Sequence, residues 1–321
     1  MALVEIASEL VGQRVALRYR IGDRDGRPLY TDAVGELRTD GPGAVLVETR
    51  RGPVRVDRAA VVAVRAVPPA PPRRAPLAAV TRLEALCADA WPAVVDRPLG
   101  AWRLRAADGF TGRANAGLAI GDPGMPVPAA LDAVRAFARE HGIRARVQVP
   151  VGSPWDKAVA AEGWELDVAH ERGAEVAVLV APLQGIRDPR VELPERPSDG
   201  WWRLALGALP TAAQRHVLDP GGDPRTAFGQ ITGPDGTVIG SVRATVVEDH
   251  LHVSVLEVAP AARRQGLATV LLASAAGWGR EHGARWGVLQ VALHNTGAVA
   301  LYDRLGYVEH HQYRYLVPPA G

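Results

Sequence analysis

The chain has 321 residues, of which 47% are hydrophobic and 22% are charged, a composition typical of a globular protein with room for two or three domains. Its net charge of +2 is too small to indicate a nucleic-acid binder, and its single cysteine, Cys87, excludes an intrachain disulfide and a cysteine-based metal site. No apolar run reaches membrane-spanning length and no signal-peptide pattern is evident, so we expect a cytoplasmic protein.

Residues 1–67 consist of short β-prone segments separated by Gly, Pro and Asp turns. Strands are expected at 14–21, 31–37, 44–49, 54–57 and 61–67. Five strands in so short a span predict a small all-β barrel, which resembles a Src-homology-3-like (SH3-like) barrel. Because its basic and acidic residues balance, we expect a packing module, with peptide or nucleic-acid binding as the alternative.

Two proline-rich segments, 68–77 and 186–200, are predicted to be linkers because proline disfavours both helix and sheet interiors. The regions 78–185 and 201–321 share a repeat, REHGIR at 139–144 and REHGAR at 280–285. In each region the motif follows an apolar helix and precedes a strand containing Gln-Val, then a short helix ending in Gly-aromatic. The sequence therefore predicts two copies of one α/β domain, with an unrelated α/β domain as the alternative for 78–185.

The first copy differs from the second where chemistry is expected. Met125 stands at the position of Gly266, and Val159 stands near the position of Tyr302. We therefore expect 78–185 to be a degenerate, non-catalytic partner and 201–321 to be the catalytic domain.

The second copy contains a glycine loop between an expected strand at 251–258 and an expected helix at 266–278. Backbone N–H groups at a helix N-terminus, together with the helix dipole, favour an anion. Gly266 and the small Ala268 allow a pyrophosphate to approach the backbone, and Arg263 or Arg264 adds positive charge. The alternative is a surface loop with a glycine and two arginines.

A second block begins at Asn295, after an expected strand at 286–293. The Asn295 amide can pair with an extended pantetheine arm or cap the next helix, and the two roles are compatible. Ala298, Leu301 and Leu305 have helical spacing and are expected in the core. Tyr302 lies one residue off that stripe, either as a proton donor or as a half-buried structural tyrosine.

The segments RRQGLA at 263–268 and NTGAVALYDRLGY at 295–307 resemble the acyl-CoA loop and the Asn/Tyr block of the GNAT superfamily of N-acetyltransferases. The duplicated layout resembles tandem-GNAT enzymes such as mycothiol synthase. With its barrel and degenerate first copy, the chain resembles an actinobacterial GNAT family whose members are often labelled histone acetyltransferases. The implied fold is α/β, two GNAT copies with central mixed sheets after a small all-β barrel.

The resemblance implies direct transfer of acetyl from acetyl-CoA to an amine in a ternary complex, without an acyl-enzyme or a metal. Acetyl-CoA would lie where the strand ending at Val258 splays from the strand carrying Gln290, with the N–H of Val258 aimed at the oxyanion. Tyr302 would be the general acid. The expected cofactor-binding residues are Leu256, Glu257, Val258, Arg263, Arg264, Gln265, Gly266, Leu267, Ala268, Thr269, Asn295 and Tyr302.

The general base is not specified by any motif. His252 needs no large pKa shift to act near neutral pH, whereas Glu257 needs a raised pKa or a bridging water. His294 is a third candidate. His310 and His311 are expected to face opposite sides of a strand, and their spacing with distant His250 matches no zinc pattern.

The main hypothesis is therefore an N-acetyltransferase whose partners are acetyl-CoA and an amine on a small molecule or a protein. The alternative is a sensor or regulatory protein that binds acetyl-CoA without turnover. We expect no membrane or nucleic-acid partner. The tandem layout favours a monomer, because a duplicated pair can bury its own dimer interface, and a homodimer is the alternative. The pair Trp201-Trp202 is interpreted as the beginning of a strand.

Overall fold

The computed structural model describes residues 6, 10–49, 52–67, 75–222 and 225–319, so most of the expected linker 68–77 lies outside the described residues. The chain divides into two compact units, Met1–Arg73 and Arg74–Gly321. Among the described residues, no helix combines the length and the apolar character that crossing a bilayer requires.

The first unit is a five-stranded antiparallel sheet with the order β4-β3-β2-β1-β5, which confirms the five expected strands. Alternate residues of β2 are buried over its central part, as expected for a sheet with one face packed on a core. The core includes Val15, Leu17, Leu37 and Val47. The strands are β1 (Arg14–Arg24), β2 (Arg27–Asp40), β3 (Ala44–Thr49), β4 (Gly52–Asp57) and β5 (Val61–Ala66).

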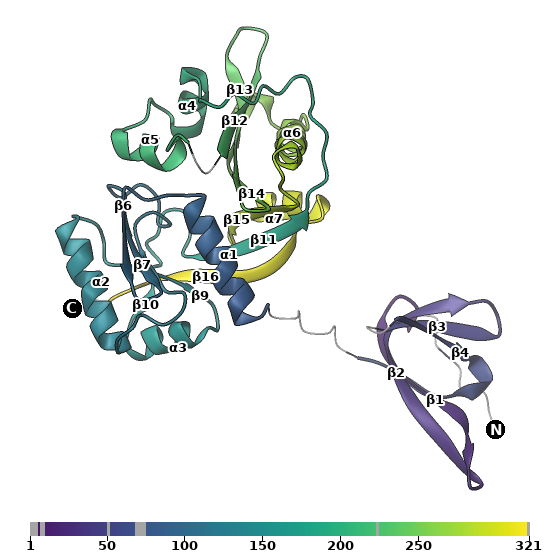
Figure 1. The fold of residues 1–321 in the computed structure, drawn as a ribbon. Helices are drawn as coiled ribbons and strands as arrows, with labels where there is room; N and C mark the ends of the chain where they lie inside the picture. Colours follow the sequence, from purple (N-terminus) through teal and green to yellow (C-terminus); the bar gives the residue numbers. More distant parts are fainter. Residues whose placement is uncertain (1–5, 7–9, 50–51, 68–74, 223–224, 320–321) are drawn as a thin grey trace. The chain divides into compact units, whose positions relative to one another are not determined.

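The second unit is built on one mixed sheet with the order β12-β13-β14-β15-β11-β16-β9-β8-β7-β6, and β10 also pairs with β16 (Figure 1). Its strands are β6 (Val95–Leu99), β7 (Trp102–Ala106), β8 (Gly117–Leu118), β9 (Val147–Pro150), β10 (Glu165–Leu166), β11 (Glu175–Pro182), β12 (Arg225–Thr232), β13 (Val238–Val247), β14 (His250–Val258), β15 (Trp286–Ala292) and β16 (Val308–Val317). Its α-helices are α1 (Leu77–Asp89), α2 (Val127–Glu140), α3 (Pro154–Ala161), α4 (Asp199–Leu206), α5 (Ala212–Leu218), α6 (Leu267–Glu281) and α7 (Thr296–Arg304).

The middle of this sheet interleaves the two halves of the unit. Strand β9, which carries Gln148, is parallel to β8 and antiparallel to β16. Strand β15, which carries Gln290, is parallel to β14 and antiparallel to β11. Each of these strands therefore has the last strand of the other half as its antiparallel neighbour.

The helices before these two strands end in the same way. His141 follows α2 and its ring lies 4.4 Å from the ring of Phe137, while His282 follows α6 and lies 4.4 Å from the ring of Trp278. In both places the next residue is a glycine with positive φ, a conformation that favours glycine. The repeated sequence motif thus adopts a repeated local structure.

Helices cover both faces of the second half of the sheet (Figure 1). On one face, Leu271 and Trp278 of α6 pack in a core with Leu251 and Val253 of β14. On the other face, the core includes residues of α4 and α5 together with Phe228 of β12. Helix α1 packs on the central strands, where its buried face includes the residues Leu83, Leu86 and Cys87.

Three sequence expectations about local structure were wrong. Trp201 and Trp202 lie on α4, not on a strand, because Ser198 caps that helix by accepting a hydrogen bond from the Trp201 N–H. In α7, Tyr302 is the buried residue and Leu305 is exposed, because the helix ends at Arg304.

The third wrong expectation concerns His310 and His311, whose Nδ1 atoms lie 2.8 Å apart. Val178 pairs with His311 and Leu179 pairs with Glu309, so His310 is an extra residue in β16. A bulge of this kind interrupts the alternation of side chains along a strand. The two rings are therefore in contact instead of on opposite faces.

Candidate active site

A bulge in β14 separates this strand from β15. The two strands pair from His250 opposite Trp286 to Val253 opposite Leu289, where the parallel ladder ends. Just beyond, Val255 has a φ of 52°, a conformation that is an outlier for a β-branched residue. On the other side of β14, only Val242 faces the two residues Val255 and Leu256, which defines the bulge.

The splay opens into a cavity of about 450 Å³. Its walls include residues 253–257 of β14 and 289–292 of β15. Of the residues expected at the thioester, Leu256 and Glu257 line this cavity. Val258, which pairs with Gly240 of β13, does not line it, and its carbonyl accepts a hydrogen bond of 3.1 Å from Nε of Arg263. The structure thus brings the bulge, and not Val258, to the cavity wall.

The loop after β14 forms a nest of free backbone donors at the N-terminus of α6. Arg264 and Gly266 both have positive φ, 62° and 77°, which shapes the turn into the helix. Each backbone N–H from Arg264 to Thr269 is without a hydrogen-bond acceptor among the described residues. Apart from the buried Leu267 and half-buried Ala268, these residues are exposed. Such a run of N–H groups at a helix N-terminus suits a phosphate or pyrophosphate.

Asn295 and Tyr302 lie together in the cavity wall, from the N-cap and the body of α7. The Oδ1 of Asn295 accepts a 3.1 Å hydrogen bond from the N–H of Ala298, so the expected capping role is observed. Burial, with the charge of Glu257, raises the pKa of Tyr302 to about 12. Its hydroxyl has no hydrogen-bond partner among the described residues, and at neutral pH it carries a proton that it can donate.

The three candidate bases have different surroundings. Glu257 lies at the cavity with its side chain largely exposed, and partial burial of its carboxyl raises its pKa, opposed by Arg263 and Arg172. His252 is fully buried and does not line the cavity. Its burial and the charges of two arginines hold its pKa well below the usual value. The third candidate, His294, is exposed on the cavity wall.

The first half of the unit supplies a wall that the sequence did not reveal. Trp91, Phe110 and Arg113 line the cavity, together with the segment 170–173 between β10 and β11. Nη1 of Arg113 donates a 2.7 Å hydrogen bond to Oε1 of Gln290. No local pattern marks these residues, because their function depends on a contact between segments that are far apart in the sequence.

The loop that carries Arg113 is held by one buried amide. Oδ1 of Asn115 accepts hydrogen bonds from the N–H groups of Ala107 and Gly109, and its Nδ2 donates to the carbonyls of Phe110 and Thr111. The loop includes two non-glycine residues with positive φ, Asp108 and Thr111. Backbone strain of this kind persists only where surrounding contacts enforce it, and it is common at functional sites.

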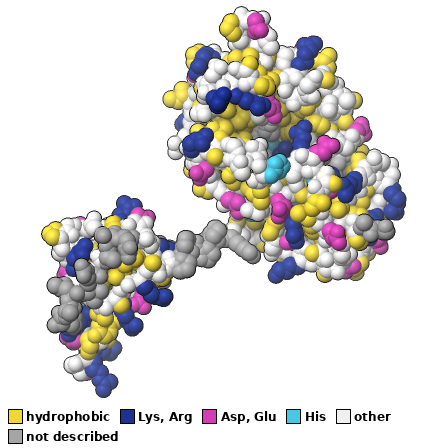
Figure 2. All heavy atoms as spheres, turned by 180° about the vertical axis from the view of Figure 1, so that it is seen from behind, with side chains coloured by type: hydrophobic (Ala, Val, Ile, Leu, Met, Phe, Trp, Pro, Cys, Tyr) yellow, Lys and Arg dark blue, Asp and Glu magenta, His cyan; other side chains and the backbone are white. Residues whose placement is uncertain are grey.

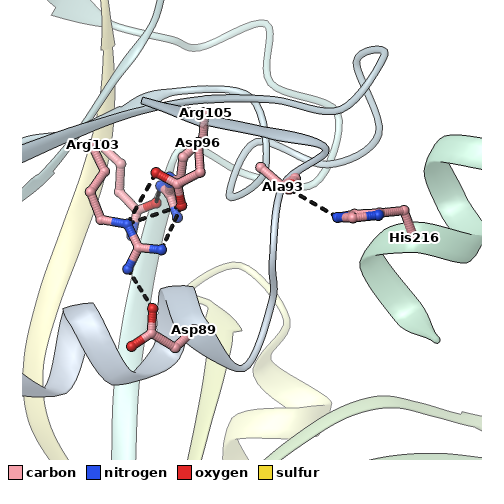
Figure 3. A network of polar contacts seen from close by, with 7 residues as sticks. Asp89, Ala93, Asp96, Arg103, Arg105 and His216 are labelled. Atoms are coloured by element: carbon pink, nitrogen blue, oxygen red, sulfur yellow. Dashed lines mark hydrogen bonds and ion pairs between the residues drawn. The ribbon is translucent and has the colours of Figure 1, made fainter. Parts of the chain in front are cut away.

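The segment that carries Trp91 is also fixed at several points (Figure 3). Arg103 is bound between Asp89 at the end of α1 and Asp96 of β6, with Nη1 2.6 Å from Asp89 and Nε 3.0 Å from Asp96. His216 of α5 lies 3.1 Å from the carbonyl oxygen of Ala93. These contacts lie on both sides of Trp91 and position it beside the cavity.

The described surface does not carry one sign of charge. In Figure 2, basic and acidic side chains are interspersed over the visible face of each unit. Many arginines in the first unit are paired with acids, for example Arg55 with Asp40 at 2.6 Å. A nucleic-acid footprint would instead gather basic residues on one face or stripe.

Comparison with known proteins gives a consistent result. A family model described as "Probable histone acetyltransferase Rv0428c C-terminal" matches residues 77–316, and one described as "Rv0428c N-terminal Sm-like domain" matches residues 10–65. The chain is 31% identical over 318 residues to Probable histone acetyltransferase Rv0428c of Mycobacterium tuberculosis, covering 95% of each chain. It is 25% identical to the uncharacterized N-acetyltransferase YobR of Bacillus subtilis, covering 73% of this chain and 98% of that protein.

Solved structures show a similar fold over most of the chain. A GCN5-related N-acetyltransferase from Kribbella flavida superimposes with a TM-score of 0.53 at 20% identity, covering 76% of this chain and 95% of that one. A tandem GNAT protein from the clavulanic acid biosynthesis pathway superimposes with a TM-score of 0.50 at 13% identity, covering 80% and 91%. The first unit, expected to be an SH3-like barrel, corresponds to the region that the family model describes as Sm-like.

Proposed function

Since this chain belongs to the family described as probable histone acetyltransferase Rv0428c and has the fold of solved GNAT N-acetyltransferases, we infer that it transfers the acetyl group of acetyl-CoA directly to an amine within a ternary complex. The observation that carries this proposal is the nest of free N–H groups from Arg264 to Thr269. This nest lies in the loop between the bulged strand β14 and helix α6. An anion site at a helix N-terminus and a polar cleft between splayed strands together suit a long ligand with a diphosphate at one end.

The residues present fit such a ligand. The loop Arg263–Thr269 would hold the pyrophosphate through backbone N–H groups and arginine charge. The exposed backbone of the bulge and the free amide donors of Asn295 would pair with the pantetheine arm. Acetyl-CoA supplies the activated thioester carbonyl.

The chain's own groups can carry the proton transfers. The amine nitrogen attacks the thioester carbon, and Glu257 accepts the amine proton directly or through a water, because its raised pKa brings it nearer to the pH of catalysis. Backbone N–H groups of the bulge at Val255 and Leu256 would stabilise the oxyanion, and the N–H of Val258 stays a candidate for the same role. As the carbon–sulfur bond breaks, the hydroxyl of Tyr302 donates its proton to the leaving thiolate.

His252 fits this scheme less well as a base. Its ring is fully buried and neither ring nitrogen has a hydrogen-bond partner among the described residues. Because protonation would place a charge beside Arg113 and Arg243, its imidazole favours the neutral state. We therefore assign His252 a structural role in the buried part of β14, outside the cavity lining.

The domain division 1–67, 78–185 and 201–321 is part of the proposal. In it the first copy is a non-catalytic partner that contributes the wall formed by Trp91, Phe110 and Arg113. The acceptor amine belongs to a small molecule or a protein.

The direct test is calorimetry of the full chain with CoA and acetyl-CoA, followed by thiol release from acetyl-CoA in the presence of a broad amine panel. We expect binding of both coenzymes and amine-dependent thiol release. The absence of binding heat for either coenzyme with folded protein would contradict the proposal.

A further inference from the structure

The cavity wall contains a cation, Arg113, for which the described residues provide no acidic partner. Arg113 reaches the point where β14 and β15 separate, and its guanidinium lies 4.5 Å from the centre of the Trp91 ring. Its guanidinium donates a hydrogen bond to the neutral amide of Gln290. Among the described residues no carboxylate lies within ion-pair distance of Arg113. Its remaining N–H donors therefore have no partner of opposite charge.

A second arginine below the cavity adds positive charge. Arg243 is fully buried, and its guanidinium lies 5.4 Å from the centre of the same Trp91 ring. It donates to the carbonyls of Leu218 and Ala90, while its Nη2 is without a partner among the described residues. Two arginines therefore lie beside one indole, and within the described part of the chain neither of them forms an ion pair with an acid.

A buried hydroxyl lies at the same place. Ser254, the first β14 residue beyond the ladder with β15, is 8% exposed and lines the cavity. Its Oγ is without a hydrogen-bond partner among the described residues. An unpaired buried donor of this kind costs free energy unless a ligand satisfies it.

The acidic side chains of the cavity lie elsewhere. Glu171 and Glu257 both line it but keep largely exposed side chains. Buried Asp219 is paired with Arg196. Both acidic side chains of the lining therefore lie on its exposed part, together with Arg172, and neither forms an ion pair with Arg113.

The side of the sheet identifies which ligand meets Arg113. Helix α6, whose N-terminus forms the nest, packs with Leu251 and Val253 on one face of β14. Trp91 instead packs with residues of α4 and α5 on the other face. A coenzyme held at α6 would approach the splayed strands from the first face. That leaves the part of the cavity lined by Trp91 and Leu206, on the second face, for the acceptor.

We propose that Arg113, supported by Ser254 and Gln290, binds a carboxylate of the acceptor, so that the acceptor is a small amino acid-like amine rather than a lysine in a basic peptide. This inference rests on the proposed acetyl transfer. A guanidinium is the side chain best suited to recognise a carboxylate through paired hydrogen bonds. A basic peptide would bring further positive charge to an end of the cavity that is already basic.

The test compares matched amines on the full chain with saturating acetyl-CoA. Glycine, β-alanine, 4-aminobutyrate and ornithine are each paired with the corresponding carboxamide, and a lysine-containing basic peptide is included. We expect kcat/KM to be about 10- to 100-fold higher for the carboxylate in at least one pair, which is the range for hydrogen bonds to a charged group. Equal rates for every pair, or preference for the basic peptide, would overturn the inference.

The variant Arg113→Gln should remove this preference and leave the affinity for acetyl-CoA unchanged, while Arg113→Lys should retain part of it. Arg139→Gln is the matched control, because Arg139 is an exposed cation on α2 and does not line the cavity. A carboxylate preference that persists in Arg113→Gln would assign recognition to other residues. Circular dichroism of the variants establishes that they are folded.

Two further arms separate the sources of failure. Calorimetry of the same carboxylates with the CoA-bound chain measures binding without turnover. If binding depends on Arg113 but no acetyl transfer is detected, the proposed acetyl transfer is contradicted and the carboxylate site is retained. Succinyl-CoA replaces acetyl-CoA in the second arm. If the wild type prefers succinyl-CoA and Arg113→Gln loses that preference, the carboxylate belongs to the acyl donor and the acceptor assignment is overturned.

Discussion

Val178 of β11 is the direct antiparallel partner of Gln290 of β15. The first residue lies in the N-terminal half of the second unit and the second in its C-terminal half, so a strand of one half completes the sheet of the other. Strand β16 does the same in the opposite direction, since Tyr315 pairs with Gln148 of β9. The C-terminal half therefore depends on the N-terminal half for its fold as well as for part of the cavity wall.

This exchange predicts that residues 186–321 alone will not form a stable domain. Without β11, both β15 and the N-terminal part of β16 lose a paired neighbour, and apolar strand edges of this kind aggregate. We expect the fragment 186–321 to be insoluble or to lack cooperative unfolding, and co-expression with 75–185 to restore a soluble complex. The fragment 75–321 is the control. A soluble 186–321 fragment with cooperative unfolding would contradict the prediction.

Tyr302→Phe is expected to lower kcat by about 10²-fold, within the range for loss of a general acid. Because the hydroxyl makes no hydrogen bond with described residues, its removal should change stability little, and the dissociation constant of acetyl-CoA should stay within about twofold. Steady-state kinetics and calorimetry measure the two effects. Unchanged turnover in Tyr302→Phe would exclude the general-acid role, and coenzyme binding without turnover in the wild type would favour a sensor.

The raised pKa of Glu257 predicts an acid limb in the pH dependence of kcat. The carboxylate form is the base, so kcat should rise with pH through that raised pKa and level off above it. Glu257→Gln should lower kcat by about 10²-fold and remove this limb. His294→Gln provides the comparison for the other candidate on the cavity wall. A limb that persists in Glu257→Gln and disappears in His294→Gln would transfer the role to His294.

The nest at α6 predicts a specific effect of replacing Gly266. Its φ of 77° is unfavourable for any side chain and most of all for a β-branched one, so Gly266→Val should displace the N–H groups and weaken CoA binding by about tenfold or more. Gly236→Val is the matched control, because Gly236 has a φ of 82° and, like Gly266, has no atom within 4 Å of its would-be Cβ. Calorimetry should show weaker binding for the first variant only. Equal losses in both would indicate general destabilisation.

The buried His252 predicts a loss of stability in acid. The pKa of His252 is well below 6.5 in the folded chain, whereas in the unfolded chain it has its ordinary value. At a pH between the folded and the unfolded pKa, only the unfolded chain therefore binds a proton at this histidine. Its contribution is thus complete above about pH 6.5 and is lost as the pH falls, by up to about 1.4 kcal/mol per pH unit. His252→Leu should unfold with a weaker pH dependence in this range.

Urea unfolding followed by tryptophan fluorescence measures this effect in the second unit alone, because all 8 tryptophans lie after Arg74. The relevant quantity is how steeply the free energy of unfolding changes with pH, compared between wild type and variant. The comparison is needed because carboxylates contribute to the pH dependence of both proteins. Parallel pH profiles would show that His252 does not supply the acid sensitivity.

The sequence by itself determined the elements whose causes are local. Turn residues and alternation predicted the five strands of the first unit, and strand–glycine–helix spacing predicted the loop at Gly266 and the position of α6. The capping role of Asn295 followed in the same way from the preference of asparagine for that position. These features depend on residues within a few positions of one another, so their signals are present in the linear chain.

The tertiary structure alone decided how the two halves combine. The exchange of β11 and β16, the contact of Arg113 with Gln290 and the placement of Trp91 join segments that are distant in sequence and carry no local mark. The bulges at Val255 and His310 likewise depend on the strands beside them, which set how many residues face one partner. Long-range pairing and burial are properties of the assembled chain, so no local stretch of sequence carries a signal for them.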